Sequence, residues 1–329
     1  MTTEAASGAL DVLQFVDDYL GLRLYPVQRF ILKLSYHLPL NSEGVAIEIR
    51  NPETQQVLRF TESEYLEYLH QAGRANIKVQ ASEARPDLVL TLGRRGGKSS
   101  LARIIAAYEL YKLLQLEDPY EHFQIMTGTQ IRVATVTLEA DLANHARSEL
   151  GYLLKNSAQR TLDAHLSRRQ TLNAMFFSTK ADLARPQDPN ELERHTSVRA
   201  DFVTCHNRGL RGRLCCAVIF DELASYPSQD QPELDSDVWD ALTPGTAHFR
   251  YRDGQAGKIA ILSTLQGHGG KLKQMTDWVM TSEQQATNWV ALQLPTWEVN
   301  PTLPGRFYQE MQATTDEATF AREYGARFL

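Results

Sequence analysis

The sequence predicts an α/β fold in which helices cover both faces of a mostly parallel β-sheet. Apolar segments of strand length alternate with segments of helical periodicity along most of the chain. The candidate strands are nearly continuous apolar runs, such as Cys215–Phe220, which is typical of parallel strands buried on both faces. The chain has 329 residues, of which 43% are hydrophobic and 22% charged, so it can supply one such core with smaller decorations.

Two helices and a β-hairpin are expected ahead of this core. Apolar residues recur at helical spacing over 9–38, and Tyr25-Pro26 interrupts them, which predicts a helix on each side of the interruption. Alternating apolar residues over 44–60 surround the turn Asn51-Pro52-Glu53-Thr54 and predict the hairpin. A short amphipathic helix is expected near 62–72. These elements divide into an N-terminal helical segment, 1–41, and an insertion, 42–82.

The core is expected to occupy residues 83–284. Its predicted strands are 87–92, 131–137, near 171–178, near 197–205, 215–220 and 258–264. Its predicted helices are 98–116, 138–156 and one that starts near 270. The stretch Gln187–Glu193 is the most loop-like, and one strand with helices over 285–329 is expected to form a small C-terminal lid or linker subdomain.

Charge and cysteine usage narrow the class of protein. The formal net charge of −6 excludes a uniformly cationic nucleic-acid coat, but it leaves room for a local basic rim that grips DNA transiently. The three cysteines include an adjacent pair, Cys215-Cys216, that is poorly placed to form a disulfide, and no Cys/His spacing indicates zinc. No signal segment is apparent and no apolar stretch approaches 18 residues, so we expect a reducing cytoplasm and no membrane span.

A glycine-rich loop between a buried strand and a helix predicts a phosphate site. The strand Asp87–Leu92 leads into the segment GRRGGKSS, and a helix follows. Glycines allow backbone N–H groups to surround phosphate oxygens, and the helix N-terminus adds positive charge. Leu92 stands where the P-loop pattern has its first glycine, and without the strand and helix the segment would indicate only a basic helix start. The predicted phosphate-binding residues are Gly93, Arg94, Arg95, Gly96, Gly97, Lys98, Ser99 and Ser100.

The chemistry expected of individual loop residues follows from their type. Lys98 would reach the β- and γ-phosphates of a nucleotide, and the Ser99 hydroxyl would ligate Mg²⁺. Two acids, Asp221 and Glu222, end the most apolar strand. Asp221 is predicted to hold the metal with Ser99, and Glu222 to polarise the attacking water. A strand that simply ends in solvated acids is the alternative for this pair.

Two weaker features agree with a nucleotide site. Ser263 and Thr264 end the strand that begins near 258, where hydroxyl groups can sense a γ-phosphate, although a strand capped by hydroxyl residues is as good an explanation of the pattern alone. Gln28 carries an amide suited to the adenine edge, although an exposed helix glutamine would look the same.

In combination, these motifs resemble the ATPase domain of the large terminase subunit of tailed bacteriophages. The resemblance runs from about Leu24 to Leu329, apart from the insertion, and the motifs keep the family's order. They are Tyr25–Gln28, the loop without its first glycine, the segment VATVTLEADLANHARSEL, Arg211-Gly212 ahead of VIFDELA, ILSTLQGHGGK, Trp297–Pro301 and Phe320–Tyr324.

This resemblance implies a P-loop NTPase of the additional-strand, RecA-like class that hydrolyses ATP with Mg²⁺ and drives double-stranded viral DNA into a procapsid. It implies that Arg94 acts as a γ-phosphate sensor or as an arginine finger in cis. The implied partners are DNA, the portal protein, the small terminase subunit and further copies in a homo-oligomeric ring, taken as a pentamer, with a monomer in isolation. The implied location is the cytoplasm of the bacterial host.

One expected feature of the family is missing from the sequence. Family members usually continue into a nuclease domain with clustered carboxylates, and this chain stops where that domain would begin. We therefore expect a motor domain without nuclease activity.

Two other functions stay open at this stage. A helicase-like nucleic-acid translocase shares several motifs, but residues 225–329 are too few for its second core. An ATP-gated scaffold with little turnover has no need of Glu222. Several arginines are candidates for a finger in trans, for DNA contact or for plain solvated surface, and none is assigned among Arg147, Arg160, Arg168, Arg169, Arg208 and Arg213.

Overall fold

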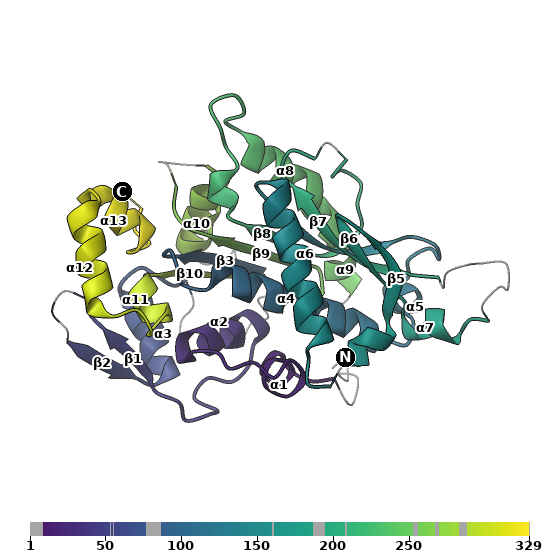
Figure 1. Cartoon of the computed structure of the whole chain (residues 1–329), viewed down its shortest axis with the longest axis horizontal. Helices are drawn as coiled ribbons and strands as arrows, with labels where there is room; N and C mark the ends of the chain where they lie inside the picture. Colours follow the sequence, from purple (N-terminus) through teal and green to yellow (C-terminus); the bar gives the residue numbers. More distant parts are fainter. Residues whose placement is uncertain are drawn as a thin grey trace. The chain divides into compact units, whose positions relative to one another are not determined.

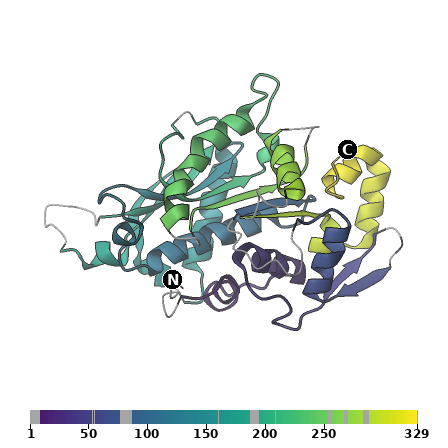
Figure 2. The same cartoon turned by 180° about the vertical axis from the view of Figure 1, so that it is seen from behind.

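The computed structural model describes most of the chain (Figures 1 and 2). The described residues are 9–52, 54, 56–76, 87–159, 161–186, 195–207, 209–252, 256–266, 270–282 and 288–328. They fall into two compact units. The first unit draws on 1–23, 102–219 and 237–259, and the second on 24–101, 220–236 and 260–329. The predicted loop Gln187–Glu193 lies outside the described residues.

The described strands form a two-stranded sheet and an eight-stranded sheet. The strand order of the larger sheet is β10-β3-β9-β8-β4-β7-β6-β5. The pairs β10–β3, β3–β9 and β4–β7 are parallel, whereas β6–β7 and β5–β6 are antiparallel. The predicted class, a mostly parallel sheet flanked by helices, is therefore confirmed.

The second unit carries all the residues predicted from the sequence to bind nucleotide. Its strands are β1 (Ile47–Arg50), β2 (Val57–Phe60), β3 (Asp87–Leu92), β10 (Trp289–Leu294), the end of β8 (Cys215–Asp221) and most of β9 (Lys258–Ser263). Its helices are α2 (Pro26–Tyr36), α3 (Glu62–Gln71), η3 (Leu223–Ser225), α10 (Lys271–Thr281), α11 (Thr296–Val299), α12 (Gly305–Thr314), α13 (Glu317–Glu323) and the first turns of α4 (Lys98–Gln115) and α8 (Leu234–Leu242).

The first unit contains the remaining strands and helices. Its strands are β4 (Ile131–Thr137), β5 (Leu166–Thr171), β6 (Ala174–Phe177), β7 (Val198–Thr204) and the first residues of β8 and β9. Its helices are α1 (Val12–Gln14), the π-helix η1 (Phe15–Tyr19), α5 (Pro119–Phe123), α6 (Ala140–Lys155), η2 (Thr161–Ala164), α7 (Lys180–Ala184), η4 (Thr243–Thr246), α9 (Ala247–Arg252) and the rest of α4 and α8.

Local sequence explains where the elements of the second unit begin and end. Every residue of β3 is buried, as expected of a predominantly apolar strand covered on both faces. Helix α2 begins at Pro26, where the missing N–H of proline costs no hydrogen bond, and the Gln28 side chain accepts a bond from the Tyr25 N–H at 3.1 Å. Helix α3 begins with a capping box between Thr61 and Glu64.

The predicted hairpin and the helix after it are confirmed as β1, β2 and α3. The hairpin pairs Ile47 with Phe60 and Arg50 with Val57. Helix α11, from the C-terminal part of the chain, lies beside β1 and α2 (Figures 1 and 2). The insertion is thus packed on the same unit that carries the phosphate loop.

Two of the strand predictions differ from the structure. The single strand expected near 171–178 is a hairpin, with Thr171 of β5 opposite Ala174 of β6 and a turn at Leu172-Asn173. Leu172 is apolar but 75% exposed, so its hydrophobicity concealed the turn. The strand expected within 285–329 is β10, which pairs with β3 in the main sheet instead of standing in a separate lid.

Three further observations concern the chain as a whole. Cys205, Cys215 and Cys216 are buried thiols. Burial raises the pKa of the Cys215 thiol to about 12, so that thiol stays protonated. None of the described helices combines the length and apolar character needed to cross a bilayer.

A buried ammonium group joins α2 to the insertion. The Lys33 side chain is fully buried, and its Nζ lies 2.8 Å from Glu62 and 3.0 Å from Glu43. The pKa of the Glu43 carboxyl lies below its usual range, chiefly because Glu43 also bonds to Arg29 and to a smaller extent because it bonds to Lys33. Substituting Lys33→Met is expected to destabilise the protein by about 3–5 kcal/mol, because it leaves the buried Glu62 without its cation.

Equilibrium urea unfolding measures this effect. The control is Lys273→Met, which removes a solvent-exposed pair with Asp277 and should change the unfolding free energy little. Equal unfolding free energies for the two variants would contradict a structural role for Lys33.

Candidate active site

The loop after β3 is shaped by close contacts at its glycines. A Cβ placed on Gly93 would lie 2.3 Å from the Thr296 hydroxyl oxygen and 2.5 Å from the Tyr324 carbonyl oxygen, so no side chain fits there. Gly97 has φ +85°, and a Cβ on it would lie 2.6 Å from the Gln28 amide nitrogen. Glycine is therefore required at both positions, by space at Gly93 and by conformation at Gly97.

Lys98 and Glu222 meet beside this loop. The Lys98 side chain is buried, and its Nζ lies 3.4 Å from the Gly93 carbonyl oxygen and 3.4 Å from Glu222 Oε1. The predicted phosphate-binding lysine and the predicted catalytic acid are thus brought together, although 124 positions separate them in the sequence numbering.

Glu222 also binds the end of strand β9. Its carboxylate accepts hydrogen bonds from the Thr264 backbone N–H at 2.7 Å and from the Thr264 hydroxyl at 3.2 Å. The Ser263 hydroxyl lies 3.4 Å from the same carboxylate. Three of the predicted elements, the loop lysine, the acid and the hydroxyl pair, therefore form one hydrogen-bonded group.

The backbone of Glu222 is strained in a way that aims its side chain. Glu222 adopts the left-handed conformation, with φ +62°, immediately after β8 ends. Such a conformation is uncommon for a residue with a side chain and is found disproportionately at functional sites. A bond from the Glu222 N–H to the Leu262 carbonyl oxygen, 2.8 Å long, holds it there. In the loop, Arg95 is also left-handed, with φ +64°.

The residues predicted to hold Mg²⁺ lie at the end of β8 and in the first turn of α4. Asp221 is the last residue of β8 and is buried, and its carbonyl oxygen accepts a bond from the Tyr226 hydroxyl at 3.2 Å. Ser99 and Ser100 are exposed in the first turn of α4. Gln28 is buried against Gly97, so its amide faces the loop.

The far side of the loop is held by residues that the sequence analysis did not assign. The Thr296 hydroxyl donates to the Arg94 carbonyl oxygen at 2.7 Å, and the Asn300 amide donates to the Arg95 carbonyl oxygen at 2.9 Å. The Arg94 N–H donates to the Glu323 carbonyl oxygen at 2.6 Å. Thr296 and Asn300 are polar residues four apart just after an apolar strand, which was the available signal.

The Arg94 side chain does not point at the Lys98–Glu222 group. Its guanidinium forms an ion pair with the Glu323 carboxylate at the end of α13, and 58% of the side chain is exposed. A phosphate-sensing role for Arg94 therefore requires the arginine to leave Glu323.

A second set of contacts ties the insertion to the residues that hold the loop. Arg74, just after α3, lies 2.9 Å from Glu298 of α11, and the Tyr65 hydroxyl donates to Glu298 at 2.6 Å. Burial raises the pKa of the Glu298 carboxyl, and burial beside Glu298 raises the pKa of Tyr65. This buried group fixes α11, which begins with Thr296.

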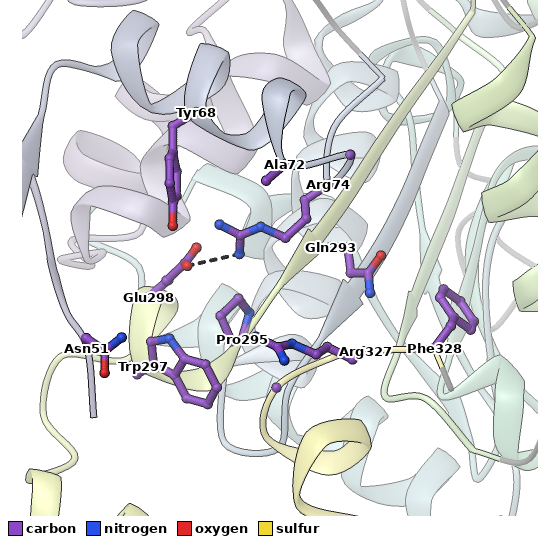
Figure 3. Close-up of a pocket in the computed structure, with 12 residues that line it drawn as sticks. Asn51, Tyr68, Ala72, Arg74, Gln293, Pro295, Trp297, Glu298, Arg327 and Phe328 are labelled. Carbon is purple, nitrogen blue, oxygen red and sulfur yellow. Dashed lines mark hydrogen bonds and ion pairs between the residues drawn. The ribbon is translucent and has the colours of Figure 1, made fainter. Parts of the chain in front are cut away.

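The Arg74–Glu298 pair lines a pocket of about 530 Å³ (Figure 3). In the figure the guanidinium and the carboxylate face each other, with Trp297 and Pro295 on the adjoining backbone. None of the residues predicted to bind nucleotide lines this pocket. The pocket lies beside the Arg74–Glu298 ion pair that supports α11, and it is distinct from the Lys98–Glu222 group.

The remaining arginines are only partly described. Arg160 and Arg208 lie outside the described residues, as do the side chains of Arg168 and Arg169. Arg147 lies on α6, and Arg213 belongs to an ion-pair cluster of the first unit.

The donor set fits a nucleoside triphosphate with Mg²⁺. A glycine loop whose backbone cannot carry side chains at Gly93, a buried lysine beside it and exposed hydroxyls in the first helical turn match the chemistry of phosphate binding. A buried aspartate at the end of β8, which β9 separates from β3 in the sheet, adds the oxygen ligand that Mg²⁺ prefers. The fold and this loop define a P-loop NTPase domain.

The comparison with protein families agrees and extends over almost the whole chain. Residues 6–321 match the family described as the N-terminal P-loop domain of the uncharacterized protein MJ0330. The chain belongs to this family of P-loop domains. A search of curated protein sequences gave no match.

Solved structures with the same fold include bacteriophage large terminases. The large terminase ATPase domain of Thermus phage P74-26 has a TM-score of 0.52 at 18% identity, covering 79% of this chain and 93% of that domain. A mutant of the same domain gives 0.50 at 20% identity, with 74% and 89% covered. The large terminase of bacteriophage HK97 gives 0.52 at 12% identity, covering 95% of this chain and 53% of that protein. The predicted terminase ATPase fold is therefore confirmed.

The crowding at Gly93 makes a direct prediction for nucleotide binding. Substituting Gly93→Ala is expected to weaken ATP binding at least about tenfold, because the new methyl group displaces the loop from backbone that cannot yield. Isothermal titration with an ATP analogue measures the change. The control is Gly151→Ala in α6, where the nearest atom to the added Cβ is a Met175 methyl carbon at 3.7 Å and affinity should be unchanged. An affinity for Gly93→Ala equal to that of the control would contradict the loop assignment.

Proposed function

We propose that this chain is an ATP-hydrolysing motor that translocates double-stranded viral DNA into a procapsid, as the ATPase domain of a large terminase subunit. The observation that carries the proposal is the hydrogen-bonded group of Lys98, Glu222 and Thr264 beside the glycine loop. A protein that only binds nucleotide has no use for an acid held against the phosphate lysine. The fold of phage terminase ATPase domains supports the finer assignment to DNA packaging.

In the proposed site, each residue has one task. The backbone of Gly93–Gly97, Lys98 and Ser100 surround the triphosphate, and Gln28 contacts the base side of the loop. Glu222 orients the attacking water and accepts its proton through the carboxylate that now accepts bonds from Thr264. Ser99 and Asp221 would hold Mg²⁺, which supplies positive charge against the β- and γ-phosphates when bound.

Arg94 and the hydroxyl pair are proposed to respond to the γ-phosphate. Arg94 exchanges Glu323 for the phosphate, since a multiply charged phosphate group offers the guanidinium a stronger bidentate partner than a singly charged carboxylate. The hydroxyls of Ser263 and Thr264 contact Glu222, and Thr264 is the first residue after β9, so loss of the γ-phosphate is relayed along the segment that follows β9. Residues 267–269 of the segment ILSTLQGHGGK lie outside the described residues.

The partners and domain boundaries of the proposed motor follow from the same assignment. They are double-stranded DNA, the portal protein, the small terminase subunit and further copies in a ring in the host cytoplasm. The segments 1–41, 42–82, 83–284 and 285–329 are proposed as its N-terminal helices, insertion, core and C-terminal segment. No nuclease activity is proposed for these residues.

Steady-state ATP hydrolysis tests the proposal most simply. In the presence of duplex DNA and with the chain assembled, Glu222→Gln is expected to lower kcat about 10²–10⁴-fold with little change in KM, since it removes the general base and keeps the side chain's shape. Lys98→Ala should lower kcat and also raise KM, because the lysine binds the ground-state phosphates. The control Glu48→Gln, on an exposed side chain of β1, should hydrolyse ATP at the unsubstituted rate.

The outcome separates the competing functions. Hydrolysis by the unsubstituted chain that is no faster than by Glu222→Gln rejects the motor. ATP binding without DNA-stimulated turnover would favour an ATP-gated scaffold, and separation of DNA strands would favour a helicase-like translocase.

A further inference from the structure

The phosphate loop contains a turn whose conformation does not suit the residue that occupies it. Residues 93–96 form a turn that is closed by a bond from the Gly96 N–H to the Gly93 carbonyl oxygen, 3.1 Å long. Arg95, the third residue of this turn, has φ +64°, whereas Arg94 is not among the non-glycine residues with positive φ. This combination matches a turn of type II, since type I′ requires positive φ at both central positions. The third position of a type II turn favours glycine, so Arg95 holds a backbone conformation that is disfavoured for arginine.

The peptide group between Arg94 and Arg95 determines this conformation. Turns of types I and II differ by a rotation of about half a turn of this central peptide, which changes ψ of the residue before it and φ of the residue after it. Because the peptide is planar and trans, its carbonyl oxygen and its N–H point in opposite directions. The direction of the Arg94 carbonyl oxygen therefore fixes both the direction of the Arg95 N–H and the sign of φ at Arg95.

A buried threonine holds that carbonyl oxygen. Thr296 of α11 is fully buried, and its hydroxyl donates to the Arg94 carbonyl oxygen at 2.7 Å. The backbone of Thr296 is fixed in turn, because its N–H donates to the Tyr324 carbonyl oxygen at 2.9 Å and its carbonyl oxygen accepts from the Asn300 N–H at 2.8 Å. The Arg95 N–H consequently points away from the Thr296 hydroxyl. This N–H has no hydrogen-bond partner within the described part of the chain.

Asn300 holds the next peptide of the loop. Its side-chain amide donates to the Arg95 carbonyl oxygen at 2.9 Å. The orientation of the amide follows from its other bonds, because its oxygen accepts from the Thr302 N–H at 3.1 Å and from the Thr302 hydroxyl at 2.6 Å. With the Arg95 carbonyl oxygen held by Asn300, the Gly96 N–H faces the opposite way and closes the turn. Thr296 and Asn300 therefore fix two successive peptides of the loop.

We propose that Thr296 is a positioning residue for nucleotide binding, which holds the central peptide of the turn so that the Arg95 N–H donates to a phosphate oxygen. This role rests on the proposed function and adds a residue to its site. Without the Thr296 hydroxyl, the turn relaxes toward type I, which removes the positive φ at Arg95 and rotates its N–H away from the phosphates. The measured affinity then falls in proportion to the fraction of molecules that keep the type II turn. Saturating nucleotide selects those molecules, so KM rises while kcat changes little.

Isothermal titration with a non-hydrolysable ATP analogue tests this role. Thr296→Val, which keeps the outline of the side chain and removes its donor, is expected to weaken binding on the order of tenfold, as the loss of one hydrogen bond to a buried carbonyl implies. Thr296→Ser keeps the hydroxyl and should bind within about threefold of the unsubstituted chain. The matched control is Thr276→Val in α10, which removes a buried hydroxyl bonded to the Leu272 carbonyl oxygen at 2.8 Å and should leave affinity unchanged.

Substitutions at Arg95 separate control of the turn from general damage. Arg95→Ala removes the guanidinium and keeps the cost of positive φ, whereas Arg95→Gly removes both. Thr296→Val is therefore expected to weaken binding about tenfold when it is added to Arg95→Ala, and less than about threefold when it is added to Arg95→Gly. A threonine that only stabilised the fold would have the same effect in both backgrounds. In steady-state hydrolysis with duplex DNA, Thr296→Val should raise KM by the factor found in the titration and keep kcat within about twofold.

The outcomes separate failure of this role from failure of the proposed function. If the unsubstituted chain binds no ATP analogue, both proposals fall. If it binds the analogue and Thr296→Val binds it as tightly as Thr276→Val does, Thr296 has no positioning role and the proposed nucleotide site stands. Equal losses of affinity on addition to Arg95→Ala and to Arg95→Gly would also overturn the role, since the hydroxyl would then act otherwise than through the turn.

Discussion

The geometry of the phosphate loop depends on the contact between Gly93 and the C-terminal backbone. The Gly93 N–H donates to the Leu294 carbonyl oxygen at 3.1 Å, while the position a Cβ would take is filled by Thr296 and Tyr324. The loop is therefore clamped between its own helix and a segment some 200 residues later. Strand β3 leads into the loop, and β10 leads into the residues that contact Gly93. Because β10 pairs with β3, one ladder of hydrogen bonds fixes the positions of both strands.

This arrangement gives the C-terminal segment a direct part in the active site. Thr296, Asn300 and Glu323 hold the backbone of Arg94 and Arg95, and Glu323 also holds the Arg94 side chain. The insertion supports the same segment from behind through Arg74 and Tyr65, which bind Glu298. If Arg94 changes its partner on nucleotide binding, α13 is therefore the first helix affected, because it loses the ion pair through Glu323. Such a coupling uses packed, hydrogen-bonded elements and needs no long-range pathway.

Much of the core could be predicted from the sequence because its strands are predominantly apolar. The strands Asp87–Leu92 and Ile131–Thr137 lie where the hydrophobic pattern placed them, and so do the glycine loop and the acids after β8. The features that the sequence did not reveal depend on contacts between segments that are distant in the chain or on the exposure of individual side chains. The apolar Leu172 concealed a turn, and no local feature shows that β10 pairs with β3. The convergence of Arg132, Arg199 and Arg213 on Asp201 arises from strand register and is equally invisible in the sequence.

The central claim is that the Gly93–Ser99 loop, with Glu222, binds and hydrolyses the triphosphate of ATP. A crystal structure with a non-hydrolysable ATP analogue and Mg²⁺ tests it most directly. The account predicts phosphate oxygens within hydrogen-bonding distance of the loop N–H groups and of Lys98 Nζ, with the Glu222 carboxylate facing the γ-phosphate. An analogue bound elsewhere, or one whose phosphates avoid Lys98, would contradict it.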